Sequence, residues 1–152
     1  MTDVTTAAPE TGFASVNGLQ MYYELHGDDG DTPLLLLHGG LFDIEQQFGA
    51  LIPSLSSGRR VIGTDFQGHG RTNDTDRPLG TPDLASDVIG LLEHLGVDNV
   101  DVFGFSIGGA VALDLAIHHP ELVRKSSFRR CRSGQRATVA ATPKRLRRCR
   151  WT

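Results

Sequence analysis

A serine flanked by glycines, placed between a strand pattern and a helix pattern, constrains the fold of this chain most. The segment is Gly104-Phe105-Ser106-Ile107-Gly108, and it separates the apolar run 99–103 from the apolar run 110–117. A serine on so sharp a turn has strained backbone angles, and the residues two positions to either side of it must be small. The pattern therefore predicts that Ser106 is a nucleophile at the N-terminus of a helix, where free N–H groups favour developing negative charge.

The rest of residues 12–123 alternates between strand and helix patterns. The predicted elements are strands at 13–18, 19–25, 33–37, 60–65 and 99–103, and helices at 44–57, 81–95 and 110–119. Asn17-Gly18 is a hairpin signal, Thr81 is expected to cap its helix, and Pro53 interrupts the weaker helical pattern around it. This order predicts an α/β fold with a doubly wound, mostly parallel sheet that ends after the helix following Ser106.

A second glycine-rich turn, His38-Gly39-Gly40, follows the apolar strand at 33–37. Ligands bind at the carboxyl ends of parallel strands, so this turn is expected beside Ser106. A tetrahedral intermediate on Ser106 needs two N–H donors for its oxyanion. We expect these donors to be the backbone N–H groups of Gly40 and Ile107, with Leu41 as the alternative to Gly40.

Three motifs in this order resemble the α/β-hydrolase fold superfamily. They are His38-Gly39-Gly40, the loop Asp65–Thr72 with its two glycines, and the turn around Ser106. The resemblance covers residues from about 12 to 124, and it is to the cofactor-free serine hydrolases: esterases, lactonases, carbon–carbon bond hydrolases and perhydrolase-type enzymes. It implies a small-molecule acyl substrate, such as an ester or a lactone, with no cofactor and no metal. Serine argues against the haloalkane dehalogenase and epoxide hydrolase branches, which use Asp at this position.

The sequence departs from this family after Ser106. In the family the triad acid and then the histidine follow the serine, each on the loop of a later strand. The only acidic residues and histidines that follow here are Asp114, His118, His119 and Glu121, on the predicted helix or at its end. We therefore assign no triad acid and no triad histidine in this chain, and we expect it to be inactive alone.

Other residues that could suggest chemistry have simpler interpretations. His38 and His69 are interpreted as packing residues of their turns, because they precede the serine in the chain. Asp65 is expected to anchor its own loop through backbone hydrogen bonds. His94 is predicted to be solvated. The Gly68 to Gly70 segment is interpreted as a turn, because the lysine of a phosphate-binding loop is missing.

Charge divides the chain abruptly. Residues 1–123 hold all 18 acidic residues and four of the 15 basic ones, whereas residues 124–152 hold the other 11 basic residues and both cysteines. We expect a flexible N-terminus at 1–11, the hydrolase-like part at 12–123, and a basic tail at 124–152 that is disordered or the product of a frameshift. Residues 126–132 are expected to be too polar to add the next strand to the sheet.

Three functions remain open from the sequence. The first is a serine hydrolase of the α/β-hydrolase family, inactive as this chain. The second is a non-catalytic interaction protein whose basic tail binds nucleic acid or anionic lipid, without specificity for a nucleic acid sequence. The third is an enzyme completed by a partner chain that supplies the histidine. The sequence does not predict the oligomeric state.

The expected location is the cytoplasm. The first residues contain no signal peptide pattern, and no apolar run is long enough to span a membrane. Cys131 and Cys149 are accordingly expected to be reduced and unpaired.

Overall fold

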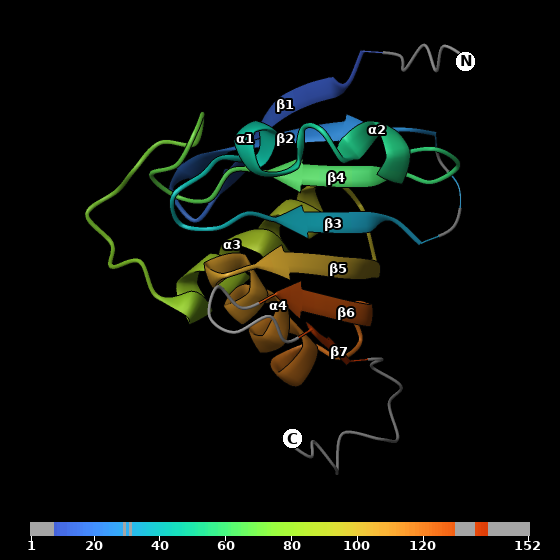
Figure 1. The fold of residues 1–152 in the computed structure, drawn as a ribbon. Coiled ribbons are helices and arrows are strands. Elements are labelled where there is room, and N and C mark those ends of the chain that lie inside the picture. Colours follow the sequence, from blue (N-terminus) through green and yellow to red (C-terminus); the bar gives the residue numbers. More distant parts are fainter. Residues whose placement is uncertain (1–7, 29, 31, 130–135, 140–152) are drawn as a thin grey trace.

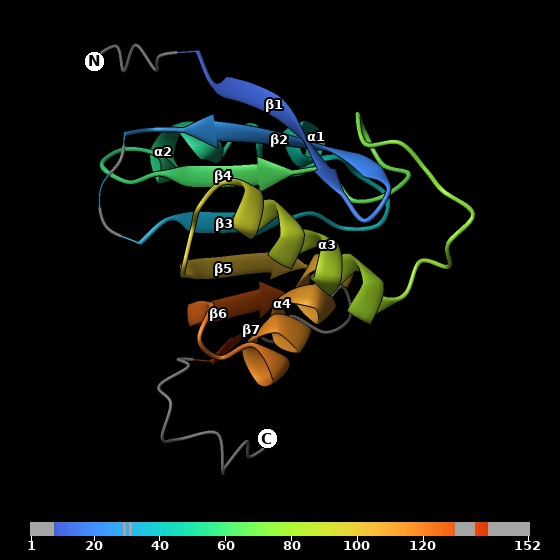
Figure 2. The same ribbon diagram turned by 180° about the vertical axis from the view of Figure 1, so that it is seen from behind.

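The computed structural model describes residues 8–28, 30, 32–129 and 136–139. Its strands are β1 (Glu10–Val16), β2 (Leu19–His26), β3 (Leu34–Leu37), β4 (Val61–Thr64), β5 (Val100–Phe105), β6 (Val123–Arg129) and β7 (Arg136–Val139). Its helices are α1 (Ile44–Phe48), α2 (Ile52–Leu55), α3 (Thr81–His94) and α4 (Ile107–His118). The strands form one sheet, with α1 and α2 on the face we call the front (Figure 1) and α3 and α4 on the back (Figure 2).

The sheet has the order β1-β2-β4-β3-β5-β6-β7. Its four central strands, β4, β3, β5 and β6, run parallel, and β1, β2 and β7 pair antiparallel at the two edges. A parallel pair needs a crossover, and helices supply all three crossovers between these central strands. The predicted α/β class, with helices on both faces of a sheet that is parallel at its centre, is confirmed.

The first two strands form the predicted hairpin. Asn17 and Gly18 both have positive φ, at 49° and 82°, as a two-residue hairpin turn requires, and Val16 faces Leu19 across it. The strand β1 begins at Glu10, so residues 10 and 11 belong to the sheet rather than to the predicted flexible N-terminus. Residues 1–7 of that segment lie outside the described residues.

The helix predicted over 44–57 is two short helices. The Asp43 side chain caps α1 by accepting from Gln46 N at 2.8 Å, and Pro53 stands in the first turn of α2, where its missing N–H costs nothing. The cap predicted for α3 is wrong by one residue. Gly80 is the N-cap and Thr81 is already helical, so no side chain bonds to this helix end.

The strand β6 corrects two expectations: that the sheet ends after the helix following Ser106, and that this segment is too polar to join it. β6 pairs parallel to β5, so β5 is an interior strand. The ladder uses backbone groups, which polar residues supply as well as apolar ones. Val123 and Ser126 are buried, and Arg124 Nε donates to Asp101 Oδ1 on β5 at 2.9 Å.

The boundary predicted at residue 124 falls within β6, because 124–129 belong to that strand and 136–139 form β7, paired antiparallel to it. The remainder of the predicted tail, 130–135 and 140–152 with both cysteines, lies outside the described residues. The frameshift hypothesis stays a prediction.

The two faces of the sheet carry separate cores. On the back, α3 and α4 pack on the central strands and bury residues such as Leu91, Val111 and Leu115 completely. On the front, α1 and α2 bury a smaller cluster around Leu36 and Phe48. Among the described helices, none combines the length and the apolar character that crossing a bilayer requires.

Candidate functional site

Ser106 lies at the junction of β5 and α4, at the carboxyl edge of the parallel strands. Its φ of 54° and ψ of −114° place a non-glycine residue in a strained region, at a typical cost of about 1–3 kcal/mol. Ser106 is the N-cap residue of α4, yet its side chain makes no capping hydrogen bond. The hydroxyl is therefore left available at a helix N-terminus.

The flanking glycines are required by contacts that a side chain would violate. A Cβ on Gly104 would lie 2.7 Å from Gly109 N and closer still to the Gly108 carbonyl group. A Cβ on Gly108 would lie 2.6 Å from His38 O and would also overlap the Leu37 carbonyl group. These contacts confirm the steric argument drawn from the sequence, and they show that the Ser106 turn packs against the end of β3.

The His38-Gly39-Gly40 turn lies beside the start of α4, next to Ser106. A Cβ on Gly40 would lie 3.7 Å from Ile107 Cγ2, so the two residues expected to supply N–H donors are neighbours. Phe42 N donates to Gly39 O at 3.2 Å, which closes a turn that leaves the N–H groups of Gly40 and Leu41 unused by it. The N–H of Ile107 is at the start of α4, where helical donors have no partner within the helix. The structure brings these groups together, and their role in catalysis stays a prediction.

His38 is a packing residue, as interpreted from the sequence. It is completely buried, and its Nε2 accepts from Phe66 N at 3.0 Å while its Nδ1 lies 2.8 Å from Gly39 O. Since Nε2 accepts, Nδ1 is the nitrogen that donates. Burial lowers the pKa of His38 below its ordinary value of 6.5, which favours this neutral ring.

The loop after β4 holds the edge of the site. Asp65 accepts from Ile44 N at 2.9 Å and from Arg71 N at 3.0 Å, so it anchors its own loop as predicted. The two ring nitrogens of His69 lie 2.8 Å from Gln67 O and 3.1 Å from Gly40 O, which ties this loop to the Gly40 turn. Gly70 has a φ of 51° and lies against the Asp65 carboxylate, which confirms a turn rather than a phosphate-binding loop.

The histidines that follow Ser106 lie at the other end of α4. The helix has 12 residues, and at about 1.5 Å per residue it separates its ends by about 18 Å. His118 Nδ1 lies 3.4 Å from Asp114 Oδ1, and His119 Nδ1 lies 3.4 Å from Glu121 Oε1. None of the hydrogen bonds within the described ranges joins Ser106 to a histidine.

The other two histidines are also accounted for. His94 is exposed on α3, as predicted, with its ring 6.0 Å from the ring of Tyr23. His26 Nε2 lies 3.0 Å from Glu24 Oε1 on β2. In the described part of the chain, no three His, Cys, Asp or Glu side chains come together as a metal site would require.

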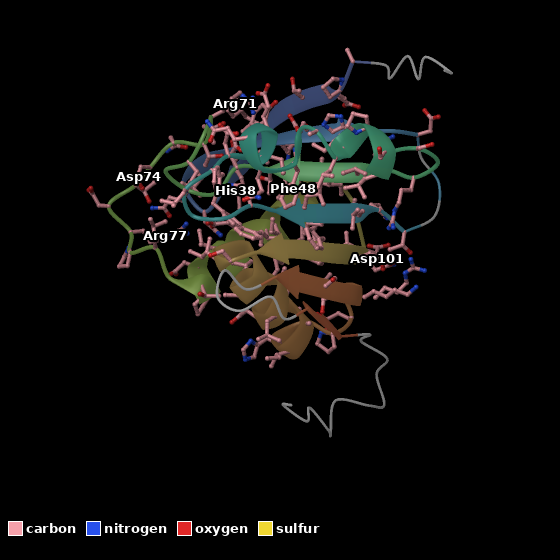
Figure 3. The ribbon with its side chains drawn as sticks, in the orientation of Figure 1. His38, Phe48, Arg71, Asp74, Arg77 and Asp101 are labelled. Carbon is pink, nitrogen blue, oxygen red and sulfur yellow. The ribbon has the colours of Figure 1, made fainter. Side chains whose placement is uncertain are left out.

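Sequence reasoning missed the ion pair that fixes the long loop between β4 and α3. Arg77 donates to both carboxylate oxygens of the buried Asp87 on α3, at 3.0 and 2.6 Å, and Asn17 Nδ2 donates to the same carboxylate at 2.9 Å. Gln67 Nε2 donates to Asp74 Oδ1 at 2.9 Å, and this bond with that from Thr75 N lowers the pKa of Asp74 (Figure 3). An aspartate on the apolar side of a helix pattern was the available signal, but its partners are distant in sequence.

A second cluster of titratable groups lies on the front face, beside a cavity of about 410 Å³. Tyr22 donates its hydroxyl to Glu24 Oε2 at 3.2 Å, and the Arg71 guanidinium stands 4.3 Å above the ring (Figure 3). Burial and the Glu24 carboxylate raise the pKa of Tyr22 to about 12. Ser106, Gly40 and Ile107 do not line this cavity, so it is separate from the nucleophile edge.

Comparison with known proteins agrees with the fold. A family model described as the alpha/beta hydrolase fold matches residues 32–126. A pyrrolizixenacetamide deacetylase of Xenorhabdus hominickii is 37% identical over 98 residues, which are 64% of this chain and 37% of that protein. The crystal structure of an enol-lactonase from Burkholderia xenovorans LB400 is 26% identical with a TM-score of 0.72, covering 75% of this chain and 44% of that one.

The similar solved structures also include enzymes named for another reaction. The crystal structure of epoxide hydrolase VrEH1 from Vigna radiata is 26% identical with a TM-score of 0.73, covering 79% of this chain and 39% of that one. The chain thus spans about two fifths of the length of these relatives, matching their N-terminal region.

Proposed function

The chain belongs to the alpha/beta hydrolase fold family, and from that premise we propose that Ser106 is the nucleophile of an acyl-transfer site whose general base lies outside the described residues. The observation that carries this proposal is the backbone of Ser106, strained at a φ of 54° with a side chain that does not cap its helix. Strain of this kind persists only where the surroundings enforce it, and the contacts of Gly104 and Gly108 do so here.

In the proposed reaction, Ser106 Oγ attacks the carbonyl carbon of an ester or a lactone. The carbonyl oxygen becomes an oxyanion, which accepts hydrogen bonds from the N–H groups of Ile107 and Gly40, or of Leu41 in place of Gly40. The tetrahedral intermediate then collapses with cleavage of the bond between the acyl carbon and the alkoxide oxygen, and the serine proton passes through the general base to that oxygen. The products are an acyl-enzyme and a hydroxyl group, which is released as an alcohol from an ester and stays attached to the acyl group when a lactone ring opens. Water hydrolyses the acyl-enzyme by the same route.

The general base must come from elsewhere because every histidine of the 152-residue sequence has another place in the structure. His38 and His69 contact the backbone of their own turns, and the remaining four belong to β2, α3 and the far end of α4. A serine hydroxyl without its base is a weak nucleophile. We therefore propose that these 152 residues have negligible turnover alone.

The surroundings of Gly40 support an apolar acyl substrate. Leu41 is 89% exposed and Phe42 is 41% exposed, so apolar side chains stand beside the proposed oxyanion donors. An apolar acyl or leaving group would bury them. A deacetylase and an enol-lactonase among the relatives agree with an acyl substrate, and the epoxide hydrolase shows that the fold alone does not choose the reaction.

A chimera tests the proposal. Residues 1–123 are joined to the portion of the Xenorhabdus hominickii deacetylase that follows the equivalent position, and hydrolysis of p-nitrophenyl butyrate is measured. We expect turnover that Ser106→Ala lowers by about 10⁴-fold or more, whereas the 152-residue chain shows none that depends on Ser106. A folded chimera without such turnover, or an active 152-residue chain whose activity Ser106→Ala abolishes, would contradict the proposal.

Binding of polyanions by the basic segment is the second candidate function. Residues 124–152 hold 11 of the 15 basic residues, but Arg124 bonds to Asp101, and Lys125 is part of β6. We propose weak, sequence-independent binding whose affinity for DNA falls log-linearly with salt. Sequence-selective binding at physiological salt would reverse the order of the two candidates.

A further inference from the structure

Two histidines contact the two peptides that carry the candidate oxyanion donors. The N–H of Gly40 shares its peptide with the carbonyl of Gly39, and the N–H of Leu41 shares its peptide with the carbonyl of Gly40. These peptides are trans, so the N–H and C=O groups of each point in opposite directions. A donor that holds one of these carbonyl oxygens therefore also sets the direction of the N–H group on the other side of the peptide.

The first of these peptides is held by a neutral ring. His38 Nδ1 donates to Gly39 O at 2.8 Å, while His38 Nε2 accepts from Phe66 N at 3.0 Å. His38 is completely buried, and burial lowers its pKa below the ordinary value of 6.5. The direction of the Gly40 N–H is therefore set without a charge on this ring.

The second peptide is held by His69 under a different condition. His69 Nδ1 lies 2.8 Å from Gln67 O, and His69 Nε2 lies 3.1 Å from Gly40 O. Both carbonyl oxygens can only accept, and a neutral imidazole carries a single N–H. Only the protonated ring of His69 can therefore donate to both carbonyls at once.

The bond to Gly40 O is the one that a neutral His69 would give up. It is the longer of the two and is exposed to solvent, whereas the bond to Gln67 O is shorter and partly buried. Water replaces a donor more easily at an exposed oxygen. A neutral ring that keeps its proton on Nδ1 turns the lone pair of Nε2 toward Gly40 O, and the carbonyl is released.

The charged groups around His69 are mainly acidic. Hydrogen bonds from Gln67 Nε2 and Thr75 N lower the pKa of Asp74, and the positive charge of His69 lowers it further. The His38 ring, 5.2 Å away between centroids, is neutral. The remaining charged groups of these turns are Asp43 and Asp65, which lie against Gly70, and Arg71, which is paired with Glu45 at 2.6 Å. A proton on His69 therefore meets carboxylates and a neutral ring rather than an unpaired cation.

We propose that protonated His69 is a positioning residue of the nucleophile edge, which fixes the peptide between Gly40 and Leu41 through the Gly40 carbonyl and releases it on deprotonation. Gly40 lies between the two held peptides, so the relative direction of the two N–H groups is set only when both carbonyls are held. Histidine ordinarily changes charge between about pH 5 and 8. The bond itself is independent of Ser106, and only its use in catalysis rests on the proposed function.

NMR spectroscopy of the isotopically labelled 152-residue chain tests the bond without any activity. The ring ¹⁵N signals of His69 report its protonation, and the carbonyl ¹³C signal of Gly40 and the amide ¹⁵N signal of Leu41 report the hydrogen bond to that carbonyl. We expect the Gly40 and Leu41 signals to move with the same pH midpoint as the ring of His69. His94→Asn removes an exposed histidine of α3 and should leave this titration unchanged.

Two substitutions of His69 separate its two bonds. The amide nitrogen of glutamine is as many bonds from the backbone as Nε2, that of asparagine is as many as Nδ1, and neither amide titrates. His69→Gln should keep the Gly40 signal at its acidic position at every pH, and His69→Asn should keep it at its alkaline position. The proposal is overturned if the Gly40 signal does not follow the ring, if the ring never carries a proton on Nε2 in that pH range, or if both variants give the same Gly40 signal.

Turnover of p-nitrophenyl butyrate by the chimera measures the consequence for catalysis. At a pH where the ring is protonated, His69→Asn should lower kcat by about tenfold, less than the loss of a whole oxyanion donor, with KM within about twofold, and His69→Gln should restore most of it. The ratio of kcat between the unchanged chimera and His69→Asn should approach one as the pH rises. A ratio independent of pH would overturn the positioning role. An inactive chimera would count against the proposed function, and the NMR signals would still decide whether His69 holds the Gly40 carbonyl.

Discussion

The two faces of the sheet differ in how much apolar surface the described helices bury against them. On the back, α3 and α4 bury a continuous apolar cluster that includes Leu91 and Leu115 without exposure. On the front, two short helices bury a small cluster, and Phe103 and Phe105 of β5 remain partly exposed. The strand β5 is therefore buried on its back face and partly exposed on its front face.

This difference in packing affects the turn at Ser106. The back face holds α4, so the strained turn at Ser106 is supported by packing within the chain itself. The front face has a groove of about 340 Å³ over β3, β5 and β6, which Leu34, Leu36 and Leu51 help to line.

The largest expected effect compares a buried leucine on the back with an exposed leucine on the front. Leu91→Ala should lower the free energy of unfolding by about 3 kcal/mol, because it leaves a cavity in the main core. Leu51→Ala should change it by less than about 0.5 kcal/mol, because that side chain is 53% exposed. Urea unfolding measures both, and equal losses would mean that the front groove is closed in solution.

The next effect concerns the loop that borders the nucleophile edge. Asp87→Ala leaves Arg77 and Asn17 without their shared carboxylate and should cost about 2 kcal/mol, less than for a fully buried pair because Arg77 is partly exposed. Glu93→Ala, at an exposed position of the same helix, is the control. Proteolysis of the loop at 66–80 should also accelerate only in Asp87→Ala. Equal losses of stability and equal rates of proteolysis in the two variants would show that the Arg77–Asp87 ion pair does not fix this loop.

A smaller effect tests the attachment of β6. Burial opposes ionisation of Asp101, but hydrogen bonds from Arg124 and Arg59 outweigh it and hold the pKa of Asp101 below its ordinary value of 3.8. Its stabilising contribution is therefore complete above pH 3.8 and is lost as the pH falls through the folded value. Asp101→Asn should cost about 1 kcal/mol at neutral pH, because both arginines are partly exposed.

Chemical denaturation between pH 3 and pH 7 measures this effect, with Asp98→Asn at an exposed position as the control. The stability of Asp101→Asn should depend less on pH at the acidic end than that of the unchanged chain. Parallel pH profiles for the two chains would show that Asp101 does not attach β6 through its charge.

Local sterics explain why the turn at Ser106 could be predicted from the sequence. Gly104 and Gly108 lie within two residues of Ser106, and the atoms that exclude a Cβ on Gly104 belong to the turn itself. The atoms that exclude a Cβ on Gly108 belong to Leu37 and His38 at the end of β3, so this second constraint comes from packing of the turn against the sheet. The hairpin at Asn17-Gly18 was predictable for the same reason, since its positive φ angles belong to the two residues themselves.

The incorrect and missed predictions concern contacts between residues that are distant in the sequence. The strand β6 was judged by the polarity of its side chains, but its place depends on backbone pairing with β5 and on the partner that Arg124 finds in Asp101, 23 residues earlier. The Arg77–Asp87 pair was missed because each residue alone is an ordinary charge in the sequence. Pattern reasoning recovers interactions within a turn or a helix, and it misses those that the tertiary fold creates.

We propose that Ser106 is placed as a nucleophile requires and that its general base is not among these 152 residues. Labelling by a fluorophosphonate, followed by peptide mass spectrometry, tests it directly, with Ser106→Ala defining the background. We expect the 152-residue chain to be labelled at the background rate, and the chimera with the later portion of the deacetylase to be labelled at Ser106 well above it. Rapid and stoichiometric labelling of Ser106 in the chain alone would contradict the claim, because a base would then have to lie within the chain.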